Sequence, residues 1–299
     1  MRIASNSVSD AMIRQIQQLT VDQAKLQNQV ATGRRIVNPE DDAAAMGRVL
    51  NLQSEQRQLT QYINNSDRAM AISQASYAGL QGLKKVSDRA GELATLGTSA
   101  IGADAMKSYA AEVDQLIEQA AELANTKLGN DYLYGGTVTS SAPLTITSDP
   151  VSGEITGVNY VGNTSRAAIP LSETSSVTPN TSGDTNAGIA TFVSNLIALR
   201  DALRSGDTSA VSSTQSTLTA SEDVIIEAMA DTGGVQARIE AAQAQQAARA
   251  TNLESLISGE ADIDLPSTVV KLSQAQTAYQ AALASAAKIM NLSLLDYIK

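Results

Sequence analysis

Near both ends of the chain, apolar positions recur every three or four residues, which is typical of helices that pair through one face. Such rows predict one helix over residues 7–32, ended by Gly33, and another over about residues 267–291. Each row holds one glutamine, Gln23 or Gln276. We expect the two helices to form a coiled coil. Its predicted interface residues are Met12, Ile16, Leu19, Leu26, Val30, Val269, Leu272, Tyr279, Leu283 and Met290.

The sequence Asn-Pro-Glu-Asp-Asp at residues 38–42 predicts the start of a second long helix. Asn38 is the expected N-cap, Pro39 suits the first turn, and the carboxylates favour the positive end of the helix dipole. A carboxylate metal or acid–base site is the alternative, but no histidine, lysine or glycine-rich loop lies next to it. A helix from residue 39 to 95 would extend roughly 85 Å, so we expect a rod.

Between the two ends, two further helical regions flank a segment of different amino-acid composition. The pattern breaks near residues 96–104 and then predicts a helix over 104–128. The segment 130–184 is rich in serine, threonine and glycine and holds four of the six prolines, so it predicts short strands separated by turns. Helices are expected again over 187–205 and over 208–257, the latter divided by Gly233 and Gly234.

These elements predict a mainly α fold. We expect an elongated antiparallel helical rod and coiled coil formed by both chain ends, with a small β-rich insertion domain. The predicted terminal coiled-coil domain combines residues 1–40 with 263–299. The helical rod combines 41–136 with 187–262, and the β-rich insertion spans 137–186.

The amino-acid composition excludes several kinds of catalytic and metal-binding site. The 299 residues include no cysteine and no histidine, which excludes disulfides, Ser-His-Asp systems and the usual zinc or haem ligands. The formal net charge of −10 argues against nucleic acid and anionic membranes as partners. No secretory signal or membrane-length apolar run is visible, so we expect no membrane insertion and either cytoplasmic residence or export without a cleaved signal. We also expect no catalytic residue, no cofactor and no metal.

Four segments carry a resemblance to a known family: ATGRRIVNPEDDAAAMGRV (31–49), ELANTKLGNDYLYGGTVTSSAPLT (122–145), ITGVNYVGN (155–163) and ASAAKIMNLSLLDYIK (284–299). Together they resemble the flagellin superfamily, and the second and fourth segments resemble its hook–filament junction branch. One departure is Ala43, where the family often has proline after the paired aspartates.

The resemblance implies a secreted structural subunit of the bacterial flagellum, exported unfolded through the flagellar type III apparatus. The implied partners are identical subunits, a neighbouring hook-associated junction protein, flagellin and an export chaperone. A short filament flagellin is the alternative within the family, and a non-flagellar coiled-coil adaptor is the remote one. The apolar tail falls beyond the predicted pairing, so we expect it to contact a chaperone or a neighbouring subunit. Its residues are Leu292, Leu294, Leu295, Tyr297 and Ile298.

Overall fold

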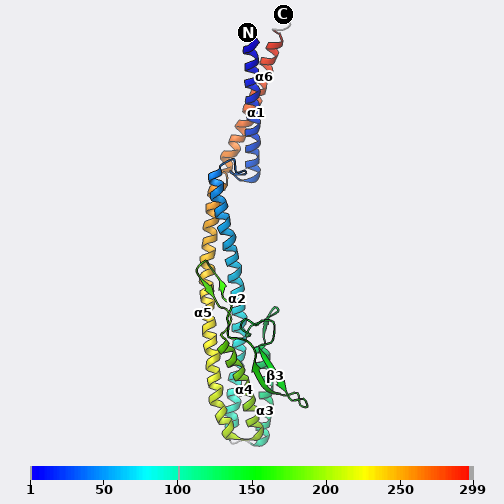
Figure 1. Ribbon diagram of the computed structural model, residues 1–299, viewed down its shortest axis with the longest axis vertical. Coiled ribbons are helices and arrows are strands. Elements are labelled where there is room, and N and C mark those ends of the chain that lie inside the picture. Colours follow the sequence, from blue (N-terminus) through cyan, green and yellow to red (C-terminus); the bar gives the residue numbers. More distant parts are fainter. Residues whose placement is uncertain (1, 100–101, 296–299) are drawn as a thin grey trace. The chain divides into compact units, whose positions relative to one another are not determined.

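The computed structural model describes residues 2–99 and 102–295, with side chains for residues 10–99 and 102–288. Long helices account for most of these residues (Figure 1). The helices are α1 (Arg2–Thr32), α2 (Ala43–Thr98), α3 (Ala103–Ala124), α4 (Gly183–Ser205), α5 (Thr208–Ala261) and α6 (Leu265–Leu295).

Short antiparallel strand pairs, β1–β2, β3–β4 and β5–β6, lie between α3 and α4 in the sequence. The strands are β1 (Lys127–Leu128), β2 (Asp131–Tyr132), β3 (Leu144–Ser148), β4 (Ile155–Tyr160), β5 (Ile169–Pro170) and β6 (Ser176–Val177). The predicted class, mainly α with a small β-rich insertion, is confirmed.

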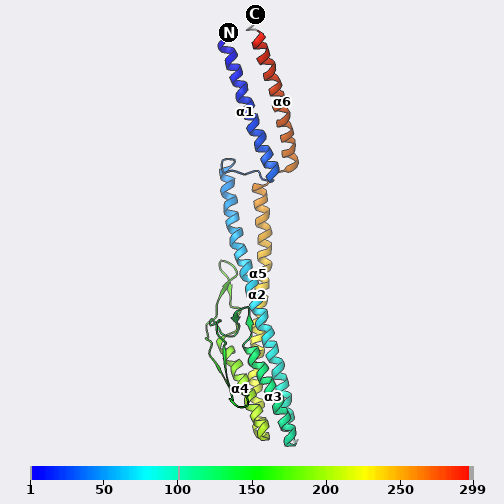
Figure 2. The ribbon, with the colours of Figure 1, turned by 90° about the vertical axis from the view of Figure 1, so that its right-hand side faces the viewer.

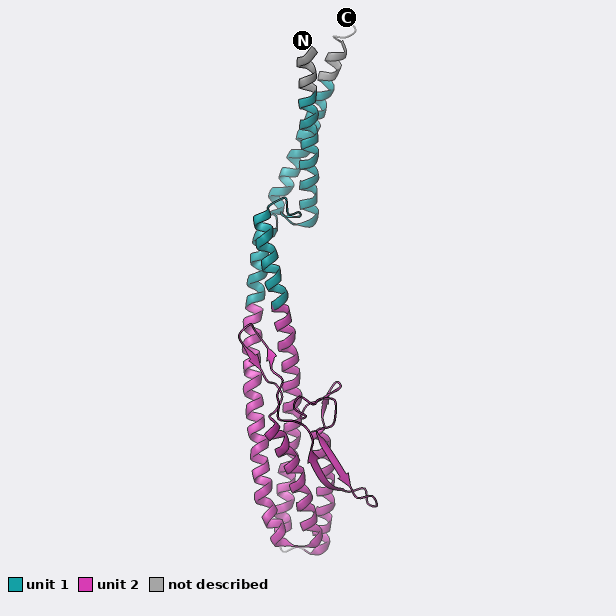
Figure 3. Ribbon diagram, in the orientation of Figure 1, with its two compact units in different colours: residues 1–58, 249–299 teal, residues 59–248 magenta. Residues whose placement is uncertain are grey.

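The chain forms two compact units (Figure 3). Unit 1 combines residues 1–58 with 249–299, and unit 2 consists of residues 59–248. The finer division into five segments, read from the sequence, remains a prediction.

In unit 1, α1 and α6 lie side by side and run in opposite directions (Figure 2). Gly33 follows α1 with a φ of +70°, a left-handed conformation that glycine adopts at little cost and that ends the helix as predicted.

Helix α2 begins later than the sequence predicts. Residues 39–41 form a turn, and the amide of Ala45 donates to Oδ1 of Asp42 at 2.9 Å. Asp42 therefore caps α2, and the assignment of Asn38 as the cap is wrong. The reason is that Asp41 stabilises the turn before the helix, because its Oδ2 accepts from the amides of Val37 and Asn38 at 3.1 and 3.0 Å.

Helix α5 passes without a break through Gly233 and Gly234, so the predicted division of this region is wrong. A glycine in a helix costs ~1 kcal/mol relative to alanine, an amount that neighbouring tertiary packing can offset. Thr232 just before the pair and Ile239 after it are both buried. These anchors on either side keep the helix continuous.

The core of unit 2 is built where α2, α3, α4 and α5 come together. Large side chains from α2 and α4, such as Leu83 and Phe192, are fully buried in it. Gly79 on α2 leaves room for the buried Tyr134, whose hydroxyl donates to the carbonyl oxygen of Ser76 at 2.8 Å. The tyrosine thus fastens the segment after β2 to α2.

The hairpin β3–β4 covers part of this core. Its register pairs Leu144 with Tyr160 and Ile146 with Val158. Ile155 and Val158 are buried, and β4 packs against α4. The hairpin therefore packs one of its faces, and the edge formed by β4, against the helices.

Candidate assembly interface

The contact positions predicted on α1 lie along one face of the helix. Each predicted position is half-buried, whereas Ile13 and Val21 between them are exposed. The half-buried row consists of Met12, Ile16, Leu19, Gln23, Leu26 and Val30.

Helix α6 turns a slightly different row inwards. Thr268 is buried, and Leu272, Ala275, Tyr279, Ala282 and Ala286 are half-buried. Of the predicted residues, Leu272 and Tyr279 belong to this row. Val269 and Leu283 instead lie 46% and 43% exposed. Small alanines thus occupy the inward row, and two large apolar side chains of α6 are left uncovered.

The end of α6 carries the remaining predicted contacts. Side chains of α6 are described only as far as Lys288, so those of Met290, Leu292, Leu294 and Leu295 lie outside the described part of the chain. Tyr297 and Ile298 lie outside the described residues altogether.

Unit 1 therefore carries apolar side chains that its own helix pair does not cover. On α1 these are Ile13 and Val21, the latter 62% exposed. On α6 they are Val269, Val270 and Leu283. Apolar surface that a helix pair leaves uncovered is available to pack against a further protein chain.

The two connectors of unit 1 are hydrogen-bonded to each other. The amide of Arg35 donates to the carbonyl of Ala261 at 2.6 Å, and the amide of Ile263 donates to the carbonyl of Gly33 at 3.0 Å. The link between α1 and α2 is thus bound to the link between α5 and α6, in an antiparallel bridge.

Ion pairs reinforce this corner. The guanidinium of Arg48 binds both carboxylate oxygens of Glu260, each at 2.9 Å, and Arg249 pairs with Glu55. The ammonium of Lys25 lies 2.8 Å from Oδ1 of Asp41. Lys25 and the two amides bonded to Asp41 lower the pKa of its carboxyl group to about 2. The Pro-Glu-Asp-Asp motif is therefore a structural corner, in which both aspartates are used for caps and ion pairs.

The two units differ in formal net charge. Unit 1 contains eleven basic and eleven acidic residues, so its formal charge is zero. Unit 2 contains ten basic and twenty acidic residues, so it carries the whole net charge of −10. Copies of unit 1 can therefore approach one another without the repulsion that acts between copies of unit 2.

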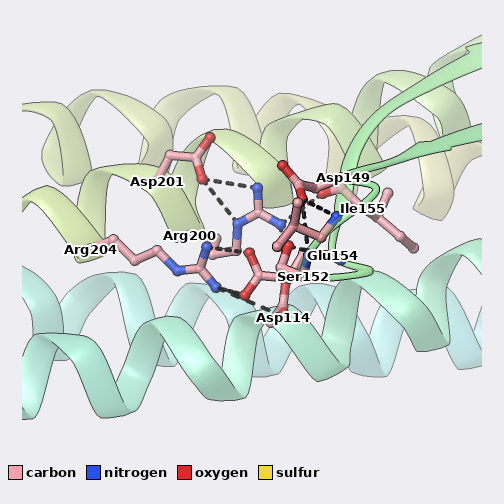
Figure 4. Close-up of polar contacts among 9 residues, drawn as sticks. Asp114, Asp149, Ser152, Glu154, Ile155, Arg200, Asp201 and Arg204 are labelled. Atoms are coloured by element: carbon pink, nitrogen blue, oxygen red, sulfur yellow. Dashed lines mark hydrogen bonds and ion pairs between the residues drawn. The ribbon is translucent and has the colours of Figure 1, made fainter.

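Unit 2 contains an ionic cluster around the buried Arg200 that fixes the β3–β4 hairpin (Figure 4). Arg200 on α4 is 3% exposed and bonds Asp114 on α3, Asp201, and the carbonyl of Ile155 at 2.9, 2.9 and 2.7 Å. Its neighbour Arg204 binds both oxygens of Glu154 at 2.6 Å each. This pairing lowers the pKa of the Glu154 carboxyl group.

Sequence reasoning found neither this cluster nor the ion pairs of the corner, because their partners lie far apart in the chain. Within the described ranges, no helix is both long and apolar enough to cross a membrane. Nor do three His, Cys, Asp or Glu side chains gather there in a way that would hold a metal ion.

The comparisons with known proteins agree with the resemblance. Residues 3–139 match the bacterial flagellin N-terminal helical region. Flagellar hook-associated protein 3 of Escherichia coli is 26% identical over 146 residues, which are 48% of this chain and 46% of that protein. The corresponding protein of Salmonella typhimurium is 25% identical over the same share. The match thus spans about half the length of these relatives.

Solved structures show the same fold. A flagellar hook-associated protein of Vibrio parahaemolyticus aligns with a TM-score of 0.66 at 14% identity, covering 74% of this chain and all of that one. FlgL of Bacillus cereus aligns with a TM-score of 0.58 at 19% identity, covering 71% and 99%. The N-terminal part of the chain is thus similar to the flagellin N-terminal helical region, and the chain is similar to flagellar hook-associated protein 3 in sequence and in fold.

Proposed function

We propose that this protein is a structural subunit of the bacterial flagellum that joins the hook side to the flagellin filament. Identical subunits would assemble through unit 1, with the α1–α6 pair at the centre of the contact. The observation that carries the proposal is the combination of uncovered apolar side chains and zero net charge on that unit. In this role the chain is a structural protein rather than an enzyme.

The proposed partners follow from the position of such a subunit. One end of the assembly would contact a neighbouring hook-associated junction protein, and the other would contact flagellin. The subunit would be secreted through the flagellar type III apparatus, and the apolar tail from Leu292 to Ile298 would bind an export chaperone before assembly. The predicted contact residues of α1 and α6 would then be covered in the assembled state.

A short filament flagellin is the competing function, because the region that residues 3–139 match is described as that of bacterial flagellin. Deleting the gene separates the two. Loss of a junction subunit leaves flagellin synthesis and export intact, so full-length flagellin should accumulate in the medium of cells that lack filaments. Absence of released flagellin would contradict the junction role, and restoration by the wild-type gene is the control.

A further inference from the structure

The two edges of the β3–β4 hairpin differ. The β4 edge faces the helices, where Arg200 of α4 donates to the carbonyl of Ile155 at 2.7 Å. The β3 edge is open, and every residue of β3 after Leu144 is exposed. Natural sheets commonly protect an open edge with lysine, proline or a bulge. β3 has the sequence Leu-Thr-Ile-Thr-Ser, which contains no lysine and no proline. The hairpin register does shift next to Ser148, but the residue left unpaired there is Thr156, in β4.

At Leu144, the backbone of this edge already forms the two hydrogen bonds that a neighbouring strand would form. The side-chain amide of Asn125 accepts from the backbone N–H of Leu144 at 3.0 Å and donates to its carbonyl at 3.2 Å. The backbone groups of Leu144 therefore point away from β4. Because the direction alternates along a strand, those of Ile146 and Ser148 point the same way. Within the described residues, neither of them has a hydrogen-bond partner on that side.

The side chains and charges around the edge indicate what would pair with it. Ile146, paired with the buried Val158, is itself 43% exposed, so an apolar side chain of an added strand would cover it. Of the carboxylates of the hairpin, that of Glu154 is paired with Arg204, whereas that of Asp149 has no basic partner within the described residues. The surroundings of the edge thus favour a positively charged partner and disfavour a second copy of the same acidic insertion.

We propose that the open edge of β3 is a docking site for an extended, lysine- or arginine-bearing segment of another protein. That segment would add a strand beside β3 and form backbone hydrogen bonds with Ile146 and Ser148. Its apolar side chain would lie over Ile146, and its basic side chains would lie near Asp149. The inference is independent of how unit 1 assembles.

The probe is the synthetic peptide Lys-Thr-Val-Thr-Val-Lys, compared with Glu-Thr-Val-Thr-Val-Glu. Full-length protein labelled with ¹⁵N-isoleucine and ¹⁵N-serine is titrated at low salt. We expect the amide signals of Ile146 and Ser148 to shift and their hydrogen exchange to slow with the lysine peptide. The glutamate peptide should bind at least ~10-fold more weakly. Unchanged Ile146 and Ser148 signals, or equal binding of both peptides, would overturn the proposal.

Two substitutions at one position separate backbone pairing from side-chain contact. Ile146→Pro removes the outward N–H but no bond to β4, whereas Ile146→Thr keeps the N–H and the strand propensity. Fluorescence anisotropy of a labelled lysine peptide should show binding lost in the proline variant and weakened only a few-fold in the threonine variant. Unshifted Ile155 and Ile169 amide signals verify the fold. A peptide-free dimer that Ile146→Pro abolishes would assign the edge to a second copy instead.

Discussion

The ammonium of Lys25, on α1, lies 2.8 Å from the carboxylate of Asp41, in the turn that precedes α2. The same carboxylate accepts from the amides of Val37 and Asn38. A single acidic residue therefore holds the connector in shape and attaches it to the first helix. Replacing it should affect the corner of unit 1 before anything else.

Asp41→Ala should destabilise the connector by about 1–2 kcal/mol, because the carboxylate that accepts from two backbone amides is lost. Lys25→Met should cost less than ~1 kcal/mol, since the ammonium is half-exposed. Hydrogen exchange at the amides of Val37 and Asn38 measures both effects. Asp22→Ala, on the exposed surface of α1, is the control and should leave these amides unchanged. Equal exchange in the wild type and in Asp41→Ala would show that the carboxylate does not order the connector.

The same carboxylate makes the corner sensitive to acid. Its pKa is lowered from 3.8 to about 2, so the ionised form is favoured in the folded protein. The stabilisation is complete above about pH 4 and is lost as the pH falls through about 2. A titration of the Asp41 carboxyl ¹³C signal should give this low midpoint. In Lys25→Met the midpoint should rise towards the ordinary value; an unchanged midpoint would mean that the ammonium contributes nothing.

Arg200→Met should destabilise unit 2 by about 1–3 kcal/mol, because the carbonyl of Ile155 loses its buried donor and Asp114 keeps only Arg204, 3.9 Å away. The hairpin amides should also exchange faster. Arg89→Met is the matched control, since Arg89 pairs with Glu92 and Glu112 on an exposed surface and its removal should change the stability of unit 2 far less. Urea unfolding monitored by circular dichroism measures both. Similar losses for the two variants would contradict a special role of the buried cluster.

Gly79→Ala should destabilise unit 2 by about 1–3 kcal/mol, because the added methyl group would overlap the hydroxyl of Tyr134. Tyr134→Phe removes that hydroxyl, so the double variant should lose less than the sum of the two single changes. The control lies on the same helix: nothing surrounds a Cβ at Gly91, so Gly91→Ala should stabilise by about 0.4–1 kcal/mol. Additive losses in the double variant would show that the hydroxyl is not the obstacle.

Local pattern was sufficient for much of the fold. The row from Met12 to Val30, the left-handed Gly33 and the strand-forming segment after α3 all follow from spacing and turn chemistry. The inward row of α6 was harder to predict, because alanines rather than Val269 and Leu283 face α1. A prediction from hydrophobicity assigns the larger side chains to the contact, whereas helices that pack against each other also accept small side chains there.

Long-range pairs could not be predicted. Arg48 and Glu260 are 212 residues apart, and Arg200 and Asp114 are 86 apart, so no local rule connects them. The cap of α2 was misplaced for a related reason. Asp41 and Asp42 both suit a helix start, and only the three-dimensional bonds of Asp41 to Lys25, Val37 and Asn38 assign the cap to Asp42.

Two substitutions on α1, Leu19→Asp and Val21→Asp, distinguish the row that faces α6 from the exposed row. Leu19→Asp should disrupt the helix pair itself and abolish incorporation while unit 2 stays folded. Limited proteolysis measures this separation: residues 1–40 should be cut faster in the variant, and the fragment of unit 2 should persist. Cleavage at the wild-type rate would show that Leu19 does not contribute to the pair.

The most direct measurement uses Val21, which is 62% exposed on α1 and lies outside the half-buried row. Val21→Asp is introduced into the deletion strain, with Ile226→Asp, an exposed position of unit 2, as the matched control. Released flagellin and attached filaments are then counted. We predict that the purified Val21→Asp monomer keeps the wild-type melting curve, whereas cells with this variant release flagellin and carry no filaments. Ile226→Asp should restore the filaments. Normal filaments in the Val21→Asp strain would contradict assembly through the exposed apolar row of unit 1.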